Sequence, residues 1–248
     1  MNYILVNNQV IEYTIIKKVN KKHITITIQP NKQIIVTSPK AVTTKEITNL
    51  LHQKSLWILK KLAEISARPS AITKQFLEGE MFPYLGNEYP LRISKYVSTN
   101  KRKGLSLHFT GRDFHAQVDA ALSSADYMPL MTEQFKIWYI SRGNELLTDR
   151  LSIYCPLLGL NPKRVTFKEQ KRRWGSCNSS GVIYLNWRLL MAPIEIVDYV
   201  LVHELAHLKH MNHSKQFWEL VESLFPDYKT AKSWLKEHGP CLTLAHNT

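Results

Sequence analysis

Cysteine is scarce in this sequence of 248 residues, and long apolar runs are absent from it. The three cysteines, Cys155, Cys177 and Cys241, are odd in number and far apart, which argues against a framework of disulfide bonds. No stretch of eighteen or more uninterrupted apolar residues occurs, so we expect no membrane-spanning helix. The N-terminus lacks a basic segment followed by an apolar one, so no secretory signal is predicted. These absences favour a soluble protein of the reducing cytoplasm.

Acidic residues are scarce relative to basic ones. The chain has 33 Lys and Arg against 20 Asp and Glu, a net charge of +13. The excess lies mainly in residues 1–125, with 18 basic and 8 acidic residues, against 15 and 12 in residues 126–248. Such an excess suits an anionic partner, nucleic acid first. The simpler explanation is a lysine-rich surface that keeps the protein in solution, so charge alone identifies no partner.

The N-terminal part of the chain has the patterns of a β-rich region. Alternating apolar and polar residues predict two strands within residues 23–39. Apolar residues at helical spacing follow, in a helix that Thr43 or Thr44 can cap. Strand-like segments separated by glycines continue to about residue 118. We therefore predict a basic, β-rich region with one helix over residues 1–125.

The remaining residues, 126–248, are predicted to form a second region. A long helix is expected from near Pro129 to Cys155. A strand-loop-strand unit over residues 164–187 and helices within residues 193–224 follow. Strands and helices in this order predict an α+β fold.

The segment VLVHELAHLKHMNHSKQFW, Val200–Trp218, contains a motif with the spacing of a metal site. In a helix, His203 and His207 differ by about 40° in azimuth and about 6 Å in rise. Both imidazoles therefore project from one stripe, as two ligands of a tetrahedral zinc ion must. Glu204, on the neighbouring edge, can reach a water on the ion without binding the ion itself, which is the HExxH arrangement with glutamate as general base. The alternative is a helix with ordinary histidines, but a buried Glu–His cluster costs several kcal/mol unless it is paired or binds metal.

A third protein ligand is needed, because two histidines and a water leave one position of a catalytic zinc unfilled. In a straight helix His213 would lie about 9 Å along the axis from His207, so the chain must turn between them. Asn212 suits such a turn, because asparagine tolerates the left-handed conformation. We predict His213 as the third ligand, with a helix N-cap as its alternative role. His210, in the last helical turn, is expected to complement the helix dipole or face solvent.

The segment RRWGSCNSSGVIYLNW, Arg172–Trp187, is predicted to lie at a sheet edge, where an extended peptide can add as another strand. Gly175 permits a close approach of backbone, Trp174 offers an apolar wall, and Arg173 can hold an anionic group or brace a carboxylate. With Tyr184, these are the predicted substrate-binding residues. The alternative is that Trp174 packs in the core and Arg173 anchors the loop.

Other side chains have weaker signals. Cys177 is expected to be a small buried hydrophobe, and Asn186 to pin the loop by a side-chain hydrogen bond. Apolar residues of the closing helices are expected in the core: Phe217, Trp218, Trp234 and Leu235. An oxyanion donor besides the metal is expected among three residues: Arg173, Tyr184 and Tyr228. Carboxylates that orient the histidine ligands are expected among four residues: Asp198, Glu219, Glu222 and Asp227.

The chain resembles the YgjP-like metallopeptidase domain family, zincins related to the WLM and SprT metalloproteases. The stretches that carry the resemblance are EGEMFPYLG (residues 78–86), RRWGSC (172–177), GVIYLNWRLL (181–190), VDYVLVHELAHL (197–208), NHSKQFW (212–218) and PDYKTAKSWLKEHG (226–239). The resemblance implies a zincin-like catalytic domain and a zinc-dependent hydrolase. It also implies one zinc ion held by His203, His207 and His213, with Glu204 as the catalytic residue.

We therefore predict a zinc metallopeptidase that acts on peptides or proteins. Metzincins are a poorer match, because their HExxHxxGxxH motif has glycine where this chain has His210, and no methionine after Met211 can form a Met-turn. The alternative from another class is a nucleic-acid-associated zinc-binding module, or a protease that acts on proteins bound to nucleic acid. Structural zinc sites are usually cysteine-rich and closed, whereas three histidines leave a position open for water.

Overall fold

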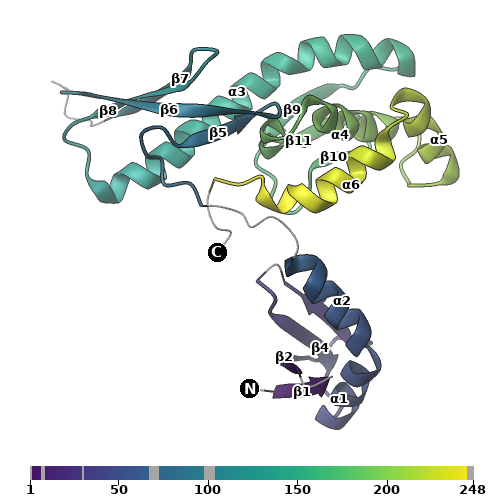
Figure 1. The fold of residues 1–248 in the computed structure, drawn as a ribbon. Coiled ribbons are helices and arrows are strands. Elements are labelled where there is room, and N and C mark those ends of the chain that lie inside the picture. Colours follow the sequence, from purple (N-terminus) through teal and green to yellow (C-terminus); the bar gives the residue numbers. More distant parts are fainter. Residues whose placement is uncertain (1, 7–8, 30, 67–72, 98–103, 245–248) are drawn as a thin grey trace. The chain divides into compact units, whose positions relative to one another are not determined.

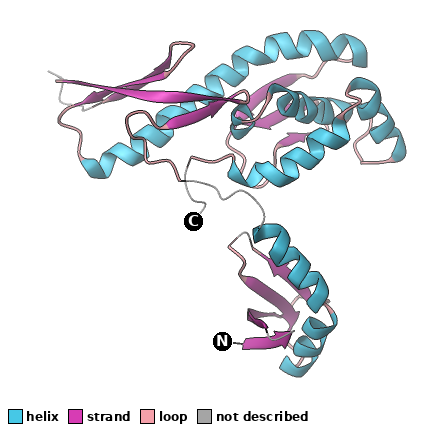
Figure 2. Ribbon diagram, viewed as in Figure 1, coloured by secondary structure: helices cyan, strands magenta, loops and turns pink. Residues whose placement is uncertain are grey.

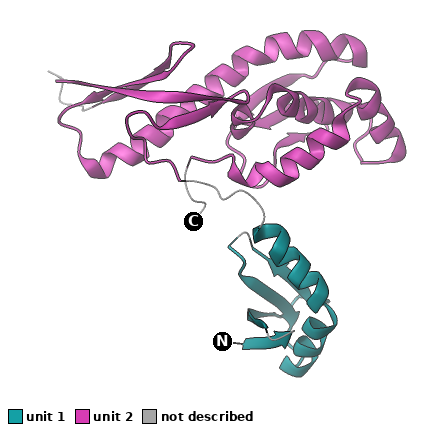
Figure 3. Ribbon diagram, in the orientation of Figure 1, with its two compact units in different colours: residues 1–69 teal, residues 70–248 magenta. Residues whose placement is uncertain are grey.

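The computed structural model describes residues 2–6, 9–29, 31–66, 73–97 and 104–244 (Figure 1). The chain forms two compact units, Met1–Pro69 and Ser70–Thr248 (Figure 3). The predicted division near residue 125 falls inside the second unit. The first unit contains 11 basic and 3 acidic residues, and the second contains 22 basic and 17 acidic residues.

The first unit is a mixed sheet with helices (Figure 2). Its described residues form β1 (Asn2–Val6), β2 (Gln9–Lys18), β3 (Thr25–Ile28), β4 (Ile34–Pro39), α1 (Thr44–Gln53) and α2 (Ser55–Ser66). The strand order is β1-β2-β4-β3, and the β3–β4 hairpin confirms the two strands predicted within residues 23–39. Thr43 begins α1 with a capping box to Glu46, and Lys54 separates α1 from α2 where one helix was predicted. Ile47 and Ile58, one from each helix, are fully buried in the core of this unit.

The second unit begins with a four-stranded sheet in the order β5-β6-β8-β7. Its strands are β5 (Met81–Tyr84), β6 (Asn87–Tyr96), β7 (Leu105–Phe109) and β8 (Phe114–Asp119). The long helix α3 (Ser124–Leu158) follows and packs on this sheet, with the Phe82 and Phe135 rings stacked 4.2 Å apart. Farther along α3, Tyr139 stacks on Trp187 at 5.6 Å. One hydrophobic core therefore runs from the sheet of β5–β8 through α3 to the C-terminal elements. Because the core is continuous, the second unit does not divide near residue 125.

The C-terminal elements form a small sheet and three helices, and they contain the HExxH motif. These elements are β9 (Arg164–Lys168), β10 (Gly175–Cys177), β11 (Val182–Asn186), η1 (Trp187–Met191), α4 (Ile194–Ala206), α5 (Lys215–Leu224), α6 (Tyr228–His238) and η2 (Gly239–Cys241). β11 is central, parallel to β9 and antiparallel to the edge strand β10. Ile183 and Leu185 of β11 are fully buried in the same core as α4. The predicted α+β fold class is confirmed.

Helix α4 is apolar on most sides and correspondingly buried. Ten of its thirteen residues are buried, so packing rather than an amphipathic stripe fixes its position. On the side that faces α3, Asp198 accepts a hydrogen bond from Arg150 at 3.2 Å, which ties the two helices together. Within the described residues, the structure contains no helix with the length and apolarity needed to cross a membrane.

Candidate metal centre

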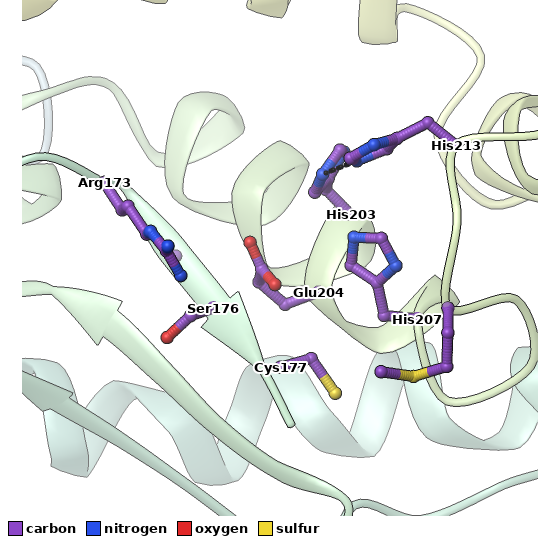
Figure 4. A pocket seen from close by; sticks show the side chains of 9 residues that line it. Arg173, Ser176, Cys177, His203, Glu204, His207 and His213 are labelled. Atoms are coloured by element: carbon purple, nitrogen blue, oxygen red, sulfur yellow. Dashed lines mark hydrogen bonds between the residues drawn. The ribbon is translucent and has the colours of Figure 1, made fainter. Parts of the chain in front are cut away.

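Three histidines converge beside α4 (Figure 4). His203 lies in the last turn of α4, His207 is its C-cap residue, and His213 lies in the loop before α5. One ligand atom from each ring lies within 4.8 Å of the other two. His203 Nε2 and His213 Nε2 are 3.1 Å apart. Two nitrogens at about 2.0–2.1 Å from a tetrahedral zinc ion are separated by about 3.3 Å, so these two side chains fit such an ion.

The chain turns sharply after α4, as the interval between His207 and His213 requires. The backbone amides of Leu208 and Lys209 donate to carbonyls three residues earlier, so the helix tightens and ends. The turn does not use the left-handed conformation expected at Asn212, which has no positive φ. Ser214 then caps α5 by accepting a hydrogen bond from the Phe217 amide at 3.3 Å. The cap at Ser214 leaves the preceding His213 imidazole free to face the other two.

A backbone carbonyl orients His207. The Nδ1 atom of His207 lies 2.9 Å from the His210 carbonyl oxygen, so a proton on Nδ1 can be donated there. In that tautomer Nε2 keeps the lone pair that a metal ligand needs. His210 thus helps to orient His207 through its backbone carbonyl. Because every residue has such a carbonyl, the sequence could not indicate this role.

Three of the four carboxylates expected to orient the ligands pair with basic side chains instead. Asp198 pairs with Arg150, Glu219 with Lys215, and Glu222 with Lys229. Asp227 is the N-terminal cap residue of α6. The Nδ1 atom of His203 is buried and has no hydrogen-bond partner among the described residues.

The histidines are electrostatically suited to bind a cation as neutral ligands. Burial lowers the pKa of His203 to about 3, with further contributions from His207, His213 and Lys232. The pKa of His213 is also lowered, first by burial and then by His207 and Lys232. Both rings are therefore neutral near pH 7 and have free lone pairs for a metal.

Glu204 follows His203 on α4 and points toward the edge strand β10 (Figure 4). Only 6% of its surface is exposed, and this burial raises the pKa of its carboxyl to about 7. The positive charge of Arg173 and a hydrogen bond from the Cys177 backbone amide both lower that pKa and limit the rise. A carboxyl with a pKa near neutrality can both accept and release a proton at physiological pH.

The burial of Glu204 predicts a pH-dependent stability of the metal-free protein. Because the folded-state pKa, about 7, exceeds the ordinary 4.5, the free energy of unfolding falls as pH rises from 4.5 through 7. We expect Glu204→Gln, which removes this charge, to stabilise the chelator-treated protein by about 1–3 kcal/mol at pH 8. At pH 4.5 the two proteins should unfold at nearly the same denaturant concentration. Urea titrations at both pH values test this, and an equal gain at both would contradict it.

Gly175 is required by the close approach of β10 to Glu204. A Cβ atom added at Gly175 would lie 2.5 Å from Glu204 Oε1 and 2.6 Å from its Cγ, which is closer than van der Waals contact permits. The expected close backbone approach at Gly175 is thus present, and Glu204 is the group that it accommodates. A glycine at this position lets the edge strand lie directly beside the carboxylate.

Gly175→Ala is therefore expected to displace the Glu204 side chain. We expect cleavage activity to fall by about 10-fold to 100-fold, because small misplacements of a reacting group are costly. Metal content should stay at the wild-type level, since the three atoms nearest to the added Cβ all belong to Glu204 and none to an imidazole. A matched control is Gly104→Ala, because Gly104, like Gly175, has no positive φ and an added Cβ there would meet within 4 Å only the Tyr96 hydroxyl, at 3.2 Å. Full activity in Gly175→Ala would show that the contact with Glu204 has no consequence.

The cavity beside the histidines has a volume of about 270 Å³. Besides His203, Glu204, His207 and His213, its lining residues are Arg173, Gly175, Ser176, Cys177 and Met211. Of the predicted substrate-binding residues, Arg173 and Gly175 therefore lie at the site. Cys177 was expected to be buried but is half-buried and borders the cavity. The alternation of a strand could have indicated this, because Cys177 shares a face with Gly175 two residues earlier.

Trp174 and Tyr184 lie elsewhere, and their prediction as substrate-binding residues is not supported by the cavity. Trp174 packs on the end of α6, where a Cβ at Gly239 would be 2.8 Å from its ring, so the core-packing alternative describes it. Tyr184 sits between the buried Ile183 and Leu185 of β11, and strand alternation directs it to the opposite face of the sheet. There the Lys168 ammonium lies 3.2 Å from its ring centroid.

Asn186 holds the loop that leads to β10, as predicted. Its side-chain amide donates to the carbonyl oxygens of Gln170 at 2.8 Å and Arg173 at 3.0 Å. Its backbone amide donates to the Trp174 carbonyl at 2.8 Å. Asn186 is 4% exposed, so these bonds are shielded from water and fix the backbone from which Arg173 enters the cavity.

Comparisons with known proteins show which family the chain is similar to. Residues 22–238 match the family described as YgjP-like, metallopeptidase domain. A solved structure, the crystal structure of the metallopeptidase zymogen of Pyrococcus abyssi abylysin, has 31% sequence identity to this chain. That match covers 36% of this chain and 92% of the other, with a TM-score of 0.33. The search of curated proteins gave no match.

Proposed function

This chain belongs to the YgjP-like metallopeptidase family, and on that premise we propose that it is a zinc-dependent peptidase with Glu204 as its general base. The observation that carries the proposal is the placement of the buried Glu204 carboxylate between the three imidazoles and the edge strand β10. His203, His207 and His213 would hold one zinc ion per chain. Nitrogen-only donors at tetrahedral spacing favour zinc over calcium or magnesium, which prefer oxygen ligands.

A bound zinc ion supplies a Lewis acid that activates water and polarises a carbonyl group. The residues of the chain do the remaining work. Glu204 accepts the proton of the attacking water at a carboxylate oxygen and donates it to the leaving amine. Arg173, the one oxyanion candidate of the three that lines the cavity, supplies a positive charge to the developing oxyanion.

The substrate would be a peptide or an unfolded segment of a protein. β10 is an edge strand, so its outer backbone groups can pair with an extended chain. A peptide bound in this way passes Gly175, where no side chain separates it from Glu204. Folded proteins rarely offer an extended segment with unpaired backbone groups. We therefore expect unfolded proteins to be cleaved in preference to folded ones.

Metal analysis combined with a protease assay tests this function. Purified protein should contain about one zinc per chain and should cleave an unfolded protein such as reduced casein. Removal of the metal by a chelator should abolish cleavage, and stoichiometric zinc should restore it. Zinc-loaded protein that cleaves no member of a diverse peptide library would contradict the proposal.

The alternative of a nucleic-acid partner has one observation in its favour, the basic first unit with its 11 basic and 3 acidic residues. The comparisons name no nucleic-acid partner. Charge of this kind is equally typical of an ordinary lysine-rich surface, so it does not by itself support a second function.

A further inference from the structure

A second cavity, of about 630 Å³, lies between α5 and α6. Its walls are the aromatic rings of Trp218 and Tyr228, and its other lining residues are Lys229, Lys232, Ser233 and Lys236. We call it the lysine groove. The two rings stack at a centroid distance of 5.3 Å and an angle of 22°, so the apolar wall is continuous. No acidic side chain is among the described residues that line it.

The charge of the lysine groove comes from one face of α6. Lys229, Lys232 and Lys236 follow one another at intervals of three and four residues, which places them along one stripe of the helix. Lys229 pairs with Glu222 at 3.2 Å. Lys232 and Lys236 form no ion pair with any residue that the structure describes. The groove therefore offers two exposed ammonium groups, without an ion-pair partner among the described residues, beside an apolar wall.

The lysine groove adjoins the candidate metal centre through Trp218. The Trp218 ring stacks on His213 at 5.8 Å and 24°, and the Lys232 Nζ atom lies 4.2 Å from the centroid of the same ring. The sum of these two distances places Lys232 Nζ no more than about 10 Å from the His213 ring. An extended peptide advances about 3.4 Å per residue. A residue within about three positions of a bond held at the histidines can therefore reach Lys232.

We propose that the lysine groove is a specificity subsite that binds a carboxylate of the peptide substrate within about three residues of the cleaved bond. The carboxylate is an Asp or Glu side chain or the free C-terminus of the peptide. The methylene groups of that residue lie against Trp218, and its carboxylate pairs with Lys232 and Lys236. This proposal rests on the peptidase function proposed above.

Peptide binding to the zinc-loaded full-length chain tests the groove without requiring cleavage. The background is the Glu204→Gln variant, so that bound peptides persist, and the readout is titration calorimetry. Three peptide sets of identical length are compared: one with Asp or Glu and blocked ends, one with Asn or Gln and blocked ends, and one with Asn or Gln and a free C-terminus. The first and third sets distinguish a side-chain carboxylate from a terminal one.

We expect at least one carboxylate-bearing set to bind about tenfold more tightly than the blocked amide set. Lys232→Met should reduce that preference to about threefold, and Lys232→Met combined with Lys236→Met should abolish it. Lys232→Glu should reverse it in favour of peptides with Lys or Arg. The control is Lys215→Met on α5, which is 87% exposed, pairs with Glu219 and lies outside the groove, and it should keep the full preference. Zinc content and thermal unfolding, measured on every variant, exclude a general loss of structure.

Several results would overturn this assignment. Binding of all three peptide sets within twofold of one another would do so, as would an equal loss of preference in Lys215→Met. Displacement of the peptide by a single-stranded oligonucleotide that needs Lys232 would assign the groove to nucleic acid instead. Cleavage by wild-type protein separates the proposed subsite from the proposed peptidase function. Cleavage without a preference for acidic residues would contradict the subsite and support the peptidase function. Carboxylate-selective binding without any cleavage would support the subsite and contradict the peptidase function.

Discussion

Glu204→Gln is expected to lower the rate of peptide cleavage by on the order of 10² to 10⁴ while the protein keeps its zinc. The amide has nearly the shape of the carboxylate but cannot accept the proton of the attacking water. Glu204 is also the proposed donor to the leaving amine, so the loss should lie near the upper end of this range. Cleavage of a peptide library, measured for both proteins at equal zinc content, is the appropriate comparison.

The control for this experiment is a neighbouring carboxylate outside the cavity. Glu195→Gln changes the charge in the first turn of the same helix and should leave the cleavage rate within about twofold of the wild type. Equal cleavage by Glu204→Gln and the wild-type protein would remove Glu204 from the mechanism. A zinc-binding module without catalysis predicts instead that Glu204→Gln leaves every function unchanged.

His213→Ala is expected to lose most of the bound zinc, whereas His210→Ala is expected to retain it. The His213 imidazole faces His203 Nε2 at 3.1 Å, while His210 contributes its backbone carbonyl, which alanine also has. Loss of one of three protein ligands should weaken zinc binding by at least about 100-fold, more than the loss of a group that only orients a ligand. Equilibrium competition with a coloured zinc chelator measures this difference directly.

Three further variants sharpen this comparison. His203→Ala and His207→Ala should lose zinc as His213→Ala does, because all three rings contribute to one cluster. His108→Ala, on the first sheet of the second unit and outside the cluster, should bind zinc as the wild type does. Zinc loss in His210→Ala together with retention in His213→Ala would show that the third ligand is the other histidine of the loop.

The sequence alone determined the features that depend on spacing along one element. His203 and His207 fall on one side of α4 because helix geometry fixes residues four positions apart, whatever surrounds the helix. The interval to His213 required a turn, and the chain turns there, although by tightening the last helical turn rather than through a left-handed Asn212. The hairpin in residues 23–39 and the α+β class followed in the same way from local alternation and period.

Tertiary structure decided which side chains from separate elements meet. Periodicity does not reveal which face of a sheet a helix covers. The sequence therefore placed Tyr184 on the correct strand, but it could not show that Tyr184 lies on the face opposite to the buried Ile183 and Leu185. The contact of Gly175 with Glu204 and the proximity of Lys232 to the histidines each join segments brought together by long-range packing. The same holds for the raised pKa of Glu204, because burial is a property of the packed core and not of the motif. The boundary after Pro69 was likewise set by the aromatic core that joins the first sheet of the second unit to α3, through contacts that no local pattern encodes.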